Sequence, residues 1–358
     1  MILGILKEKD ENRVALTPKL ALKLGSLGVD IHMEKNAGLL AGFVDSDYPD
    51  NVNILDRKKT LESSDVLASV NPLSMDDYKE AGKNTLVISM FAPYFDSTFS
   101  NQLMAMGLRV GSLDMIPRTT LAQSMDVLSS MASIAGYRAV LLASTHMNKY
   151  MPMMITAAGS IRPAKVFILG AGVAGLQAIA TARRLGSIVS AFDTRSAVKE
   201  EVQSLGAKFV EIEGAIADDK GGYAVEQTEE FLKNQRARVQ EIASDSDVVI
   251  TTAQVRGRKA PELITKETIE KMKPGAVVVD LAASTGGNCA LTQNNKTIIH
   301  NGVTIIGDSN LAAGMPGDAS EMFSNNLVNF MKTMIKEGDL EIDQNNEILA
   351  SAILNFSK

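Results

Sequence analysis

The stretch Lys165-Val-Phe-Ile-Leu-Gly-Ala-Gly-Val-Ala-Gly175 decides the fold of this 358-residue chain. Its apolar start predicts a strand, and the pattern after its last glycine predicts a helix that runs to Leu185 and ends at Gly186. A second apolar run, residues 188–192, ends at Asp193. This order of strand, glycine turn, helix, strand and acid is typical of the first half of a dinucleotide-binding fold.

The three glycines of this turn have separate roles in the fold that it predicts. Gly170 allows the tight turn, Gly172 lets the backbone approach a pyrophosphate, and Gly175 lets the helix pack close to the strand. The start of the helix then offers N–H groups and the positive end of its dipole to the phosphates. We predict that Gly170, Ala171, Gly172, Val173 and Gly175 bind the cofactor; the alternative is a tight turn without a ligand.

Asp193 ends the second strand, about 20 residues after the turn, where a carboxylate can hold the ribose hydroxyls of adenosine. Its charge would repel a 2′-phosphate, so the sequence favours NAD over NADP. Arg195 would reverse this preference if it paired with a phosphate. The alternative for Arg195 is a solvated side chain on a loop.

The composition is that of an ordinary soluble protein, with 45% apolar and 22% charged residues, and its length favours two domains. A net charge of −6 gives no indication of a nucleic-acid partner. The single cysteine, Cys289, fits a reducing compartment and is expected to be a buried packing residue. Three histidines that do not cluster make a metal site unlikely by pattern. No run qualifies as a membrane span, since the uncharged residues 166–182 are short and contain three glycines.

Apolar runs alternate with helical segments along the chain, which predicts an α/β fold of two Rossmann-like domains with parallel sheets, braced by long interdomain helices. The N-terminal domain would comprise residues 1–135 and be completed by the C-terminal helical segment 312–358, and residues 136–311 would form the NAD-binding domain. Strands are expected at residues 2–6, 30–33, 65–70, 85–90, 165–169, 188–192, 207–212, 247–252, 276–281 and 303–306. Helices are expected at residues 18–27, 97–106, 196–205, 261–272 and 318–336.

Near the end of the first stretch of the predicted N-terminal domain lies Arg118-Thr-Thr-Leu-Ala-Gln-Ser-Met-Asp-Val-Leu-Ser-Ser130. If this stretch is helical, Gln123, Asp126 and Ser129 lie near one another on one face. A structural ion pair between Arg118 and Asp126 is the alternative to a binding role. Residues 149–163 would then form the crossing loop.

The polar loop at residues 213–224 contains Gly221 and Gly222 directly before Tyr223. Loops of this length inside a compact domain are often lids over a binding site. The alternative is a solvated insertion with a surface tyrosine.

Several of these motifs together resemble the NAD(H)-binding domain I of proton-translocating NAD(P) transhydrogenase. They are the 118–130 stretch, Gly136-Tyr-Arg-Ala139, the 170–175 turn, Phe192-Asp-Thr-Arg195 and Gly222-Tyr-Ala224, followed by Ile250-Thr-Thr-Ala253 and the region from Asp280 to Gly286-Gly-Asn-Cys289. The resemblance covers nearly the whole chain. The chain resembles the split form of the enzyme, in which this domain is a separate alpha-1 polypeptide.

The resemblance implies that hydride passes directly between NAD(H) on this chain and NADP(H) on a beta subunit, coupled to proton translocation by membrane-spanning subunits. It also implies a homodimer that is cytoplasmic and peripheral to the inner membrane. The residues that it places at the nicotinamide or the catalytic step are Arg118, Gln123, Asp126, Ser129 and Tyr223. The further nucleotide-contact positions that it implies are Thr119, Thr120, Thr194, Arg195, Gly222, Gln235, Ala253 and Gln254.

The alanine dehydrogenases are related and share Arg13-Val-Ala-Leu-Thr-Pro18. They use a lysine and a histidine on their amino or keto acid, whereas residues 69–72 and 90–94 of this chain contain neither. Imine chemistry needs such a proton donor and acceptor. The absence of both residues counts against alanine dehydrogenase activity, which is one alternative function. A catalytically silent NAD-binding module is the other. Departures from the family pattern occur at Gln254-Val-Arg-Gly-Arg258 and Leu311-Ala-Ala-Gly-Met-Pro316.

Overall fold

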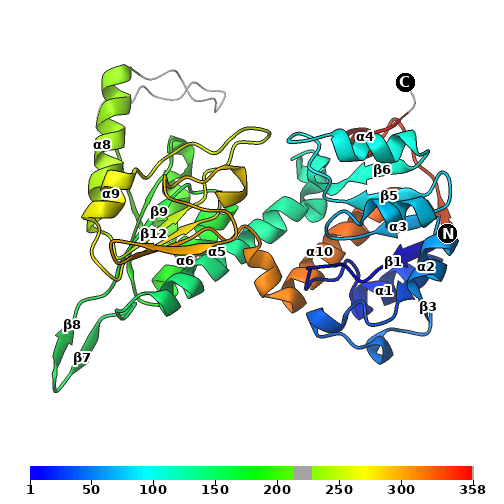
Figure 1. Cartoon of the computed structure of the whole chain (residues 1–358), viewed down its shortest axis with the longest axis horizontal. Coiled ribbons are helices and arrows are strands. Elements are labelled where there is room, and N and C mark those ends of the chain that lie inside the picture. Colours follow the sequence, from blue (N-terminus) through cyan, green and yellow to red (C-terminus); the bar gives the residue numbers. More distant parts are fainter. Residues whose placement is uncertain (213–227, 357–358) are drawn as a thin grey trace. The chain divides into compact units, whose positions relative to one another are not determined.

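The computed structural model describes residues 1–212 and 228–356, and the chain divides into two compact units (Figure 1). Unit 1 comprises Met1–Met131 together with Ala312–Lys358, and unit 2 comprises Ala132–Leu311. Each unit contains a largely parallel sheet covered by helices, as the α/β pattern predicts. The first boundary falls within a single long helix, α5 (Val127–His146).

The sheet of unit 1 has the strand order β3-β2-β1-β4-β5-β6, and all its pairs are parallel. The order reverses between β1 and β4, which is where a doubly wound sheet opens a crevice at the carboxyl ends of its strands. Four strands match the prediction, whereas the half-buried β3 and the mostly buried β6 were not predicted. The elements are β1 (Ile2–Ile5), α1 (Pro18–Gly25), β2 (Asp30–Glu34), β3 (Val52–Leu55), α2 (Arg57–Ser63), β4 (Val66–Ala68), α3 (Met75–Glu80), β5 (Leu86–Ser89), α4 (Thr98–Ala105) and β6 (Arg109–Ser112).

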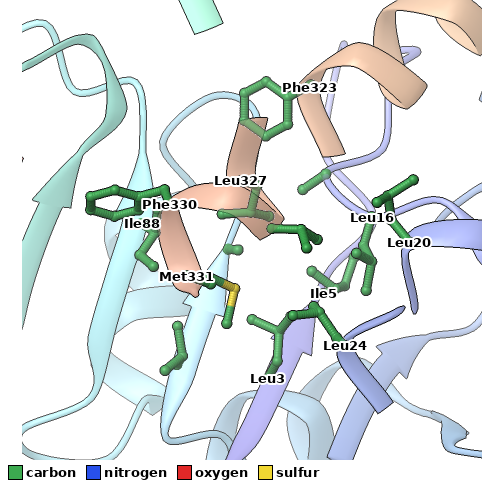
Figure 2. Close-up of a cluster of buried hydrophobic side chains, with 14 of the residues drawn as sticks. Leu3, Ile5, Leu16, Leu20, Leu24, Ile88, Phe323, Leu327, Phe330 and Met331 are labelled. Atoms are coloured by element: carbon green, nitrogen blue, oxygen red, sulfur yellow. The ribbon is translucent and has the colours of Figure 1, made fainter. Parts of the chain in front are cut away.

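The helix α10 (Pro316–Met331) belongs to the core of unit 1, the unit that also contains the N-terminal residues. Figure 2 shows Phe323, Leu327 and Met331 of α10 among side chains of β1 and α1. Two buried hydrogen bonds add to this packing: the N–H of Val14 donates to Ser320 Oγ at 2.9 Å, and that of Thr17 to Ser324 Oγ at 3.0 Å. The chain after α10 continues to α11 (Glu347–Ala352).

The sheet of unit 2 has the strand order β11-β10-β9-β12-β13-β15-β14, in which only β14 is antiparallel to its neighbour. It therefore has seven strands where about six were expected, and the extra one is β14. Its turn to β15 contains Asn301 and Gly302, both with positive φ, which is the strongest short hairpin signal. The strands are β9 (Lys165–Leu169), β10 (Ile188–Phe192), β11 (Lys208–Phe209), β12 (Val248–Thr251), β13 (Val277–Asp280), β14 (Thr297–His300) and β15 (Val303–Ile306).

The helices of unit 2 and one hairpin complete the fold. The segment predicted to be the crossing loop, residues 149–163, contains a hairpin of two antiparallel strands, β7 (Met154–Thr156) and β8 (Gly159–Ile161). Figure 1 shows this hairpin as a two-stranded ribbon that extends beyond the sheet of its unit. The remaining helices are α6 (Val173–Arg184), α7 (Lys199–Ser204), α8 (Glu229–Asp245) and α9 (Lys266–Lys271), the last much shorter than the predicted 261–272.

Contrary to the expectation that no segment qualifies as a membrane span, one helix of the described residues does so by length and composition. That helix is α5. A core helix of a soluble protein passes the same test, so the finding is weak evidence for a span.

Candidate functional site

The glycine turn of unit 2 joins β9 to α6, at the point where the strand order of the sheet reverses. Gly170 has a φ of +97°, and a Cβ at this position would lie 2.4 Å from Thr252 Oγ1. A Cβ on Gly175 would lie 1.9 Å from the carbonyl oxygen of Gly170. Both glycines are therefore required by the backbone and its packing, whether or not a ligand is bound.

Gly172 is different, because nothing in the described part of the protein requires a glycine there. Its backbone is extended, with φ −82° and ψ −168°, and a Cβ would meet no heavy atom within 4 Å. It is also the N-cap of α6 and has no side chain to cap the first N–H groups of the helix. The turn thus leaves open space beside uncapped backbone donors, which is the arrangement that binds a phosphate.

Asp193 lies directly after β10 and contacts this turn through its carboxylate. Its Oδ2 accepts the N–H of Ala171 at 2.8 Å, and its two oxygens form a bidentate ion pair with Arg195, with Nε to Oδ1 and Nη2 to Oδ2 both at 3.0 Å. Burial raises the pKa of Asp193, but the hydrogen bonds from Arg195 and Ala171 outweigh burial and leave the pKa below its usual value. The carboxylate therefore remains charged in the position predicted for the ribose.

The ends of β12 and β13 form the neighbouring part of the crevice, where Ala253 and Gln254 follow β12. The side chain of Asn288 clamps Ala253 in both directions: it accepts the N–H of Ala253 at 3.0 Å and donates to its carbonyl oxygen at 2.9 Å. Gln254 Nε2 donates to the carbonyl oxygen of Leu281 at 2.8 Å. These bonds fix the backbone of Ala253 and the side chain of Gln254, at two positions that the resemblance assigns to the nucleotide.

Asp280, at the end of β13, holds the Asn288 loop in turn. It is fully buried, and its carboxylate accepts the N–H groups of Asn288 at 2.7 Å and Cys289 at 3.0 Å. Thr251 Oγ1 at 2.9 Å, the N–H of Ala282 at 3.0 Å and Thr292 Oγ1 at 2.6 Å complete its shell. In the part of the chain that the structure describes, no basic side chain pairs with it. Asp280 and Asn288 lie within one of the motifs that carry the family resemblance, but no role was predicted for either residue.

Cys289 is buried, as predicted, and burial raises the pKa of its thiol. A buried thiol with a raised pKa is a poor nucleophile. Cys289 therefore acts as a packing residue of the loop that Asp280 holds.

The predicted nicotinamide-binding residues lie in unit 1. The prediction that Gln123, Asp126 and Ser129 share one helical face is wrong, because residues Thr120–Met125 form a separate 3-10 helix and α5 begins only at Val127. Asp126 instead caps α5: its carboxylate accepts the N–H of Ser129 at 2.9 Å and the hydroxyl of Ser129 at 2.6 Å. An aspartate before an apolar run is a common N-cap, which explains the break.

Around this cap, the side chains of Arg118, Thr119, Thr120 and Gln123 are all exposed. Among the described ion pairs, none joins Arg118 to Asp126, so the structural alternative for that pair is not observed. The 3-10 helix is held by α10, because Asn326 Nδ2 and Asn329 Nδ2 both donate to the carbonyl oxygen of Ser124, at 2.9 and 3.2 Å. No sequence signal pointed to these two asparagines, which lie 202 and 205 residues beyond Ser124 in the chain.

Two groups of predicted residues remain. Gln235 is half-buried on α8, and no hydrogen bond joins its side chain to another residue within 1–212 or 228–356. Thr194 is exposed beside Asp193. Gly222 and Tyr223, with the loop predicted to be a lid, lie outside the described residues.

The crevice of unit 1, at the ends of β1 and β4, contains a buried polar network. Arg13 forms a buried bidentate ion pair with Glu11, through Nε at 2.8 Å and Nη2 at 2.7 Å, and Asn71 Nδ2 donates to the same carboxylate at 2.6 Å. Glu8 accepts the N–H groups of Val70 and Asn71 at 2.6 and 2.8 Å, and burial raises its pKa to about 7. Among the described residues whose contacts are given above, the network contains neither a lysine nor a histidine.

Comparison with known proteins agrees with this architecture. The N-terminal and C-terminal domain models of the alanine dehydrogenase/PNT family match residues 4–135 and 139–357. The first part of the NAD(P) transhydrogenase alpha subunit of Rickettsia prowazekii is 41% identical over 94% of this chain and 90% of its own length. The NAD(P) transhydrogenase alpha subunit of Haemophilus influenzae is 40% identical over 98% of this chain and 69% of its own length.

Solved structures of similar proteins point to the same family. A transhydrogenase from Sinorhizobium meliloti, 40% identical, superposes with a TM-score of 0.89 and covers 99% of this chain and 98% of its own. An L-alanine dehydrogenase shares the fold, with a TM-score of 0.81 at 22% identity over 99% of this chain and 94% of its own. The chain therefore belongs to the alanine dehydrogenase/PNT family and, within it, to the NAD(H)-binding alpha subunits of NAD(P) transhydrogenase.

Proposed function

We propose that this subunit binds NAD(H) and exchanges hydride directly with NADP(H) held on a separate beta subunit. The observation that carries the proposal is the turn at Gly172, where the backbone leaves open space beside uncapped helix donors and beside the charged Asp193. A pyrophosphate fits the first feature and an adenosine ribose fits the second. NAD(H) is favoured over NADP(H) at this site because Asp193 remains charged.

In unit 1, we propose that Arg118, Gln123 and Ser129 orient the nicotinamide, as the family resemblance implies. A carboxamide needs both a donor and an acceptor, and the exposed Gln123 offers both. The hydroxyl proton of Ser129 is already donated to Asp126, so Ser129 is left to accept a hydrogen bond from the amide N–H₂. The role of Asp126 is then to fix the Ser129 hydroxyl and the start of α5.

The chemistry of the proposed reaction explains why the site is rich in anchors and contains no obvious general base. The nicotinamide ring supplies the hydride or accepts it, so the protein is required to hold the ring in place and to exclude water. The asparagines of α10 that hold Ser124, and the Asp280–Asn288 network, are suited to that task because they fix backbone on either unit without exposing a titratable group.

We further propose that membrane-spanning partner subunits couple the transfer to proton translocation. The relatives are named as alpha subunits, or as the first part of one, which supports the presence of other subunits. The chain would act as a homodimer in the cytoplasm, attached to the inner membrane through these partners.

The network at Glu11 and Arg13 argues against alanine dehydrogenase activity. An arginine that binds a substrate carboxylate must be available to it, but Arg13 is 5% exposed and already forms a bidentate pair with Glu11. The network also has no lysine or histidine to carry the proton that imine chemistry needs.

The decisive experiment mixes the purified chain with the NADP(H)-binding subunit of a relative and follows the reduction of NADP⁺ by NADH. We expect turnover only when both proteins are present. Ammonia-dependent reduction of pyruvate by this chain alone would instead establish an amino-acid dehydrogenase. NADH binding without hydride transfer to any partner would establish a silent binding module.

A further inference from the structure

The carboxylate of Asp193 has no lone pair left for a ligand. A carboxylate accepts about four hydrogen bonds, two on each oxygen. Oδ1 accepts the backbone N–H of Arg195 at 2.9 Å and its Nε at 3.0 Å. Oδ2 accepts the N–H of Ala171 at 2.8 Å and Nη2 of Arg195 at 3.0 Å. A ribose hydroxyl that donates to Asp193 must therefore displace one of these donors.

The four donors differ in how easily they can be displaced from the Asp193 carboxylate. The two backbone N–H groups belong to the turn before α6 and to the chain after β10, so their loss would require the backbone to move. The Arg195 side chain is 54% exposed, whereas that of Asp193 is 8% exposed. The guanidinium can therefore swing into solvent by rotation of its own side chain, and it vacates one lone pair on each oxygen.

We propose that Arg195 is a specificity-determining residue that competes with the adenosine ribose for Asp193. In the free protein it occupies the carboxylate, and it must release the carboxylate before the two ribose hydroxyls can donate there. The released guanidinium stays beside the ribose, where it would attract a 2′-phosphate that the carboxylate alone would repel. This inference rests on the proposed binding of NAD(H) in unit 2.

The competition predicts how the affinities for NADH and NADPH change when the Arg195 side chain is removed. Loss of the Arg195 side chain removes a competitor of NADH, and it removes a cation that favours NADPH. Because the arginine is more than half exposed, the pair contributes little free energy, so the gain in NADH affinity should be about two- to fivefold. The loss in NADPH affinity should be at least as large, and the ratio of the two affinities should rise by about tenfold.

The test is titration of the full chain with NADH and NADPH, followed by fluorescence, for the wild type and Arg195→Met. Methionine keeps the unbranched stem and the backbone N–H but removes the side-chain donors. Arg184→Met is the matched control, because it removes the same charge at the far end of α6 and should leave the affinity ratio unchanged. Arg195→Lys, a point charge without the bidentate fork, should fall between wild type and Arg195→Met.

A second measurement starts from the protein without cofactor. In ¹⁵N spectra of the free protein, the Arg195 Nε–H signal, assigned by its absence in Arg195→Met, should be protected from exchange with water. NADH should remove that protection. Equal losses of NADH and NADPH affinity in Arg195→Met, or no change in either, would overturn the competition. Failure of the wild type to bind NADH would instead contradict the proposed function, and the free-protein signal would still report whether the pair forms.

Discussion

Glycine-to-alanine substitutions within the 170–175 turn distinguish a glycine that the fold requires from a glycine that ligand binding requires. At Gly175 the added Cβ would lie 1.9 Å from the carbonyl oxygen of Gly170, which is backbone and cannot rotate away. At Gly172 the same Cβ would meet nothing within 4 Å, and the local φ of −82° suits alanine. The two substitutions are chemically identical and three residues apart.

The expected magnitudes differ accordingly. Gly175→Ala should lower the free energy of unfolding by about 3 kcal/mol or more, because overpacking against fixed backbone is at the upper end of the 1–3 kcal/mol range. For Gly172→Ala, alanine is a poorer N-cap than glycine but restricts the unfolded chain, and these opposing effects leave a net change within about 0.5 kcal/mol. Its methyl group would instead fill the space proposed for the pyrophosphate and lower NADH affinity at least about tenfold, or 1.4 kcal/mol.

Thermal unfolding and NADH titration of both variants check these values. The informative protein is Gly172→Ala, since it should unfold at the wild-type temperature and yet bind NADH poorly. Wild-type affinity for NADH in a stable Gly172→Ala variant would refute the assignment of this space to the pyrophosphate. A stable Gly175→Ala variant would refute the steric account of the turn.

Three further outcomes are expected. Gln123→Asn should lower the hydride-transfer rate by about a hundredfold with little change in NADH affinity, measured with the partner subunit, because an orientation error of about 1 Å has that effect; a parallel loss of affinity would indicate a general binding role. Asn288→Ala should lower the free energy of unfolding by about 1–3 kcal/mol in denaturant titrations, because it leaves the N–H and carbonyl oxygen of Ala253 unpaired. Glu8 has a folded-state pKa raised from 4.5 to about 7, so its favourable contribution to the free energy of unfolding is complete below about pH 4.5 and is lost as the pH rises through 7. Between these pH values, the free energy of unfolding of Glu8→Gln should therefore rise by up to about 3 kcal/mol relative to that of the wild type. A difference between the two proteins that stays constant across this range would contradict the raised pKa.

Local sequence carried enough information for the elements that form the dinucleotide fold. The glycine spacing predicts β9, the turn and α6, because Gly170 and Gly175 are required by backbone geometry or by contacts within a few residues of them. The hairpin turn at Asn301 and Gly302 carries an equally local signal, although the strand predictions, which rest on apolar runs, do not include β14. The break between the 3-10 helix and α5 lies at Asp126, a residue type that is more favourable as an N-cap than inside a helix.

The remaining parts of the candidate site depend on pairs that are distant in sequence. Asn288 meets Ala253 across 35 residues, and Asn326 meets Ser124 across 202. An asparagine shows no periodicity and has many possible partners, so a single sequence cannot predict which backbone group it will bind. Arg195 and Asp193 are only two residues apart, but the choice between solvent, phosphate and carboxylate for the guanidinium depends on side-chain geometry that the sequence does not specify.

The place of α10 in unit 1 has a consequence for the order of folding during synthesis. Residues 132–311 are continuous, so unit 2 can fold as soon as they leave the ribosome, whereas the core of unit 1 lacks Phe323, Leu327 and Met331 until the end of α10 is made. Translation of the 200 residues from 131 to 331 takes roughly 10–40 s at 5–20 residues per second. During that interval the nascent first unit exposes the apolar faces of β1 and α1, so it is the part of the chain that most needs a chaperone.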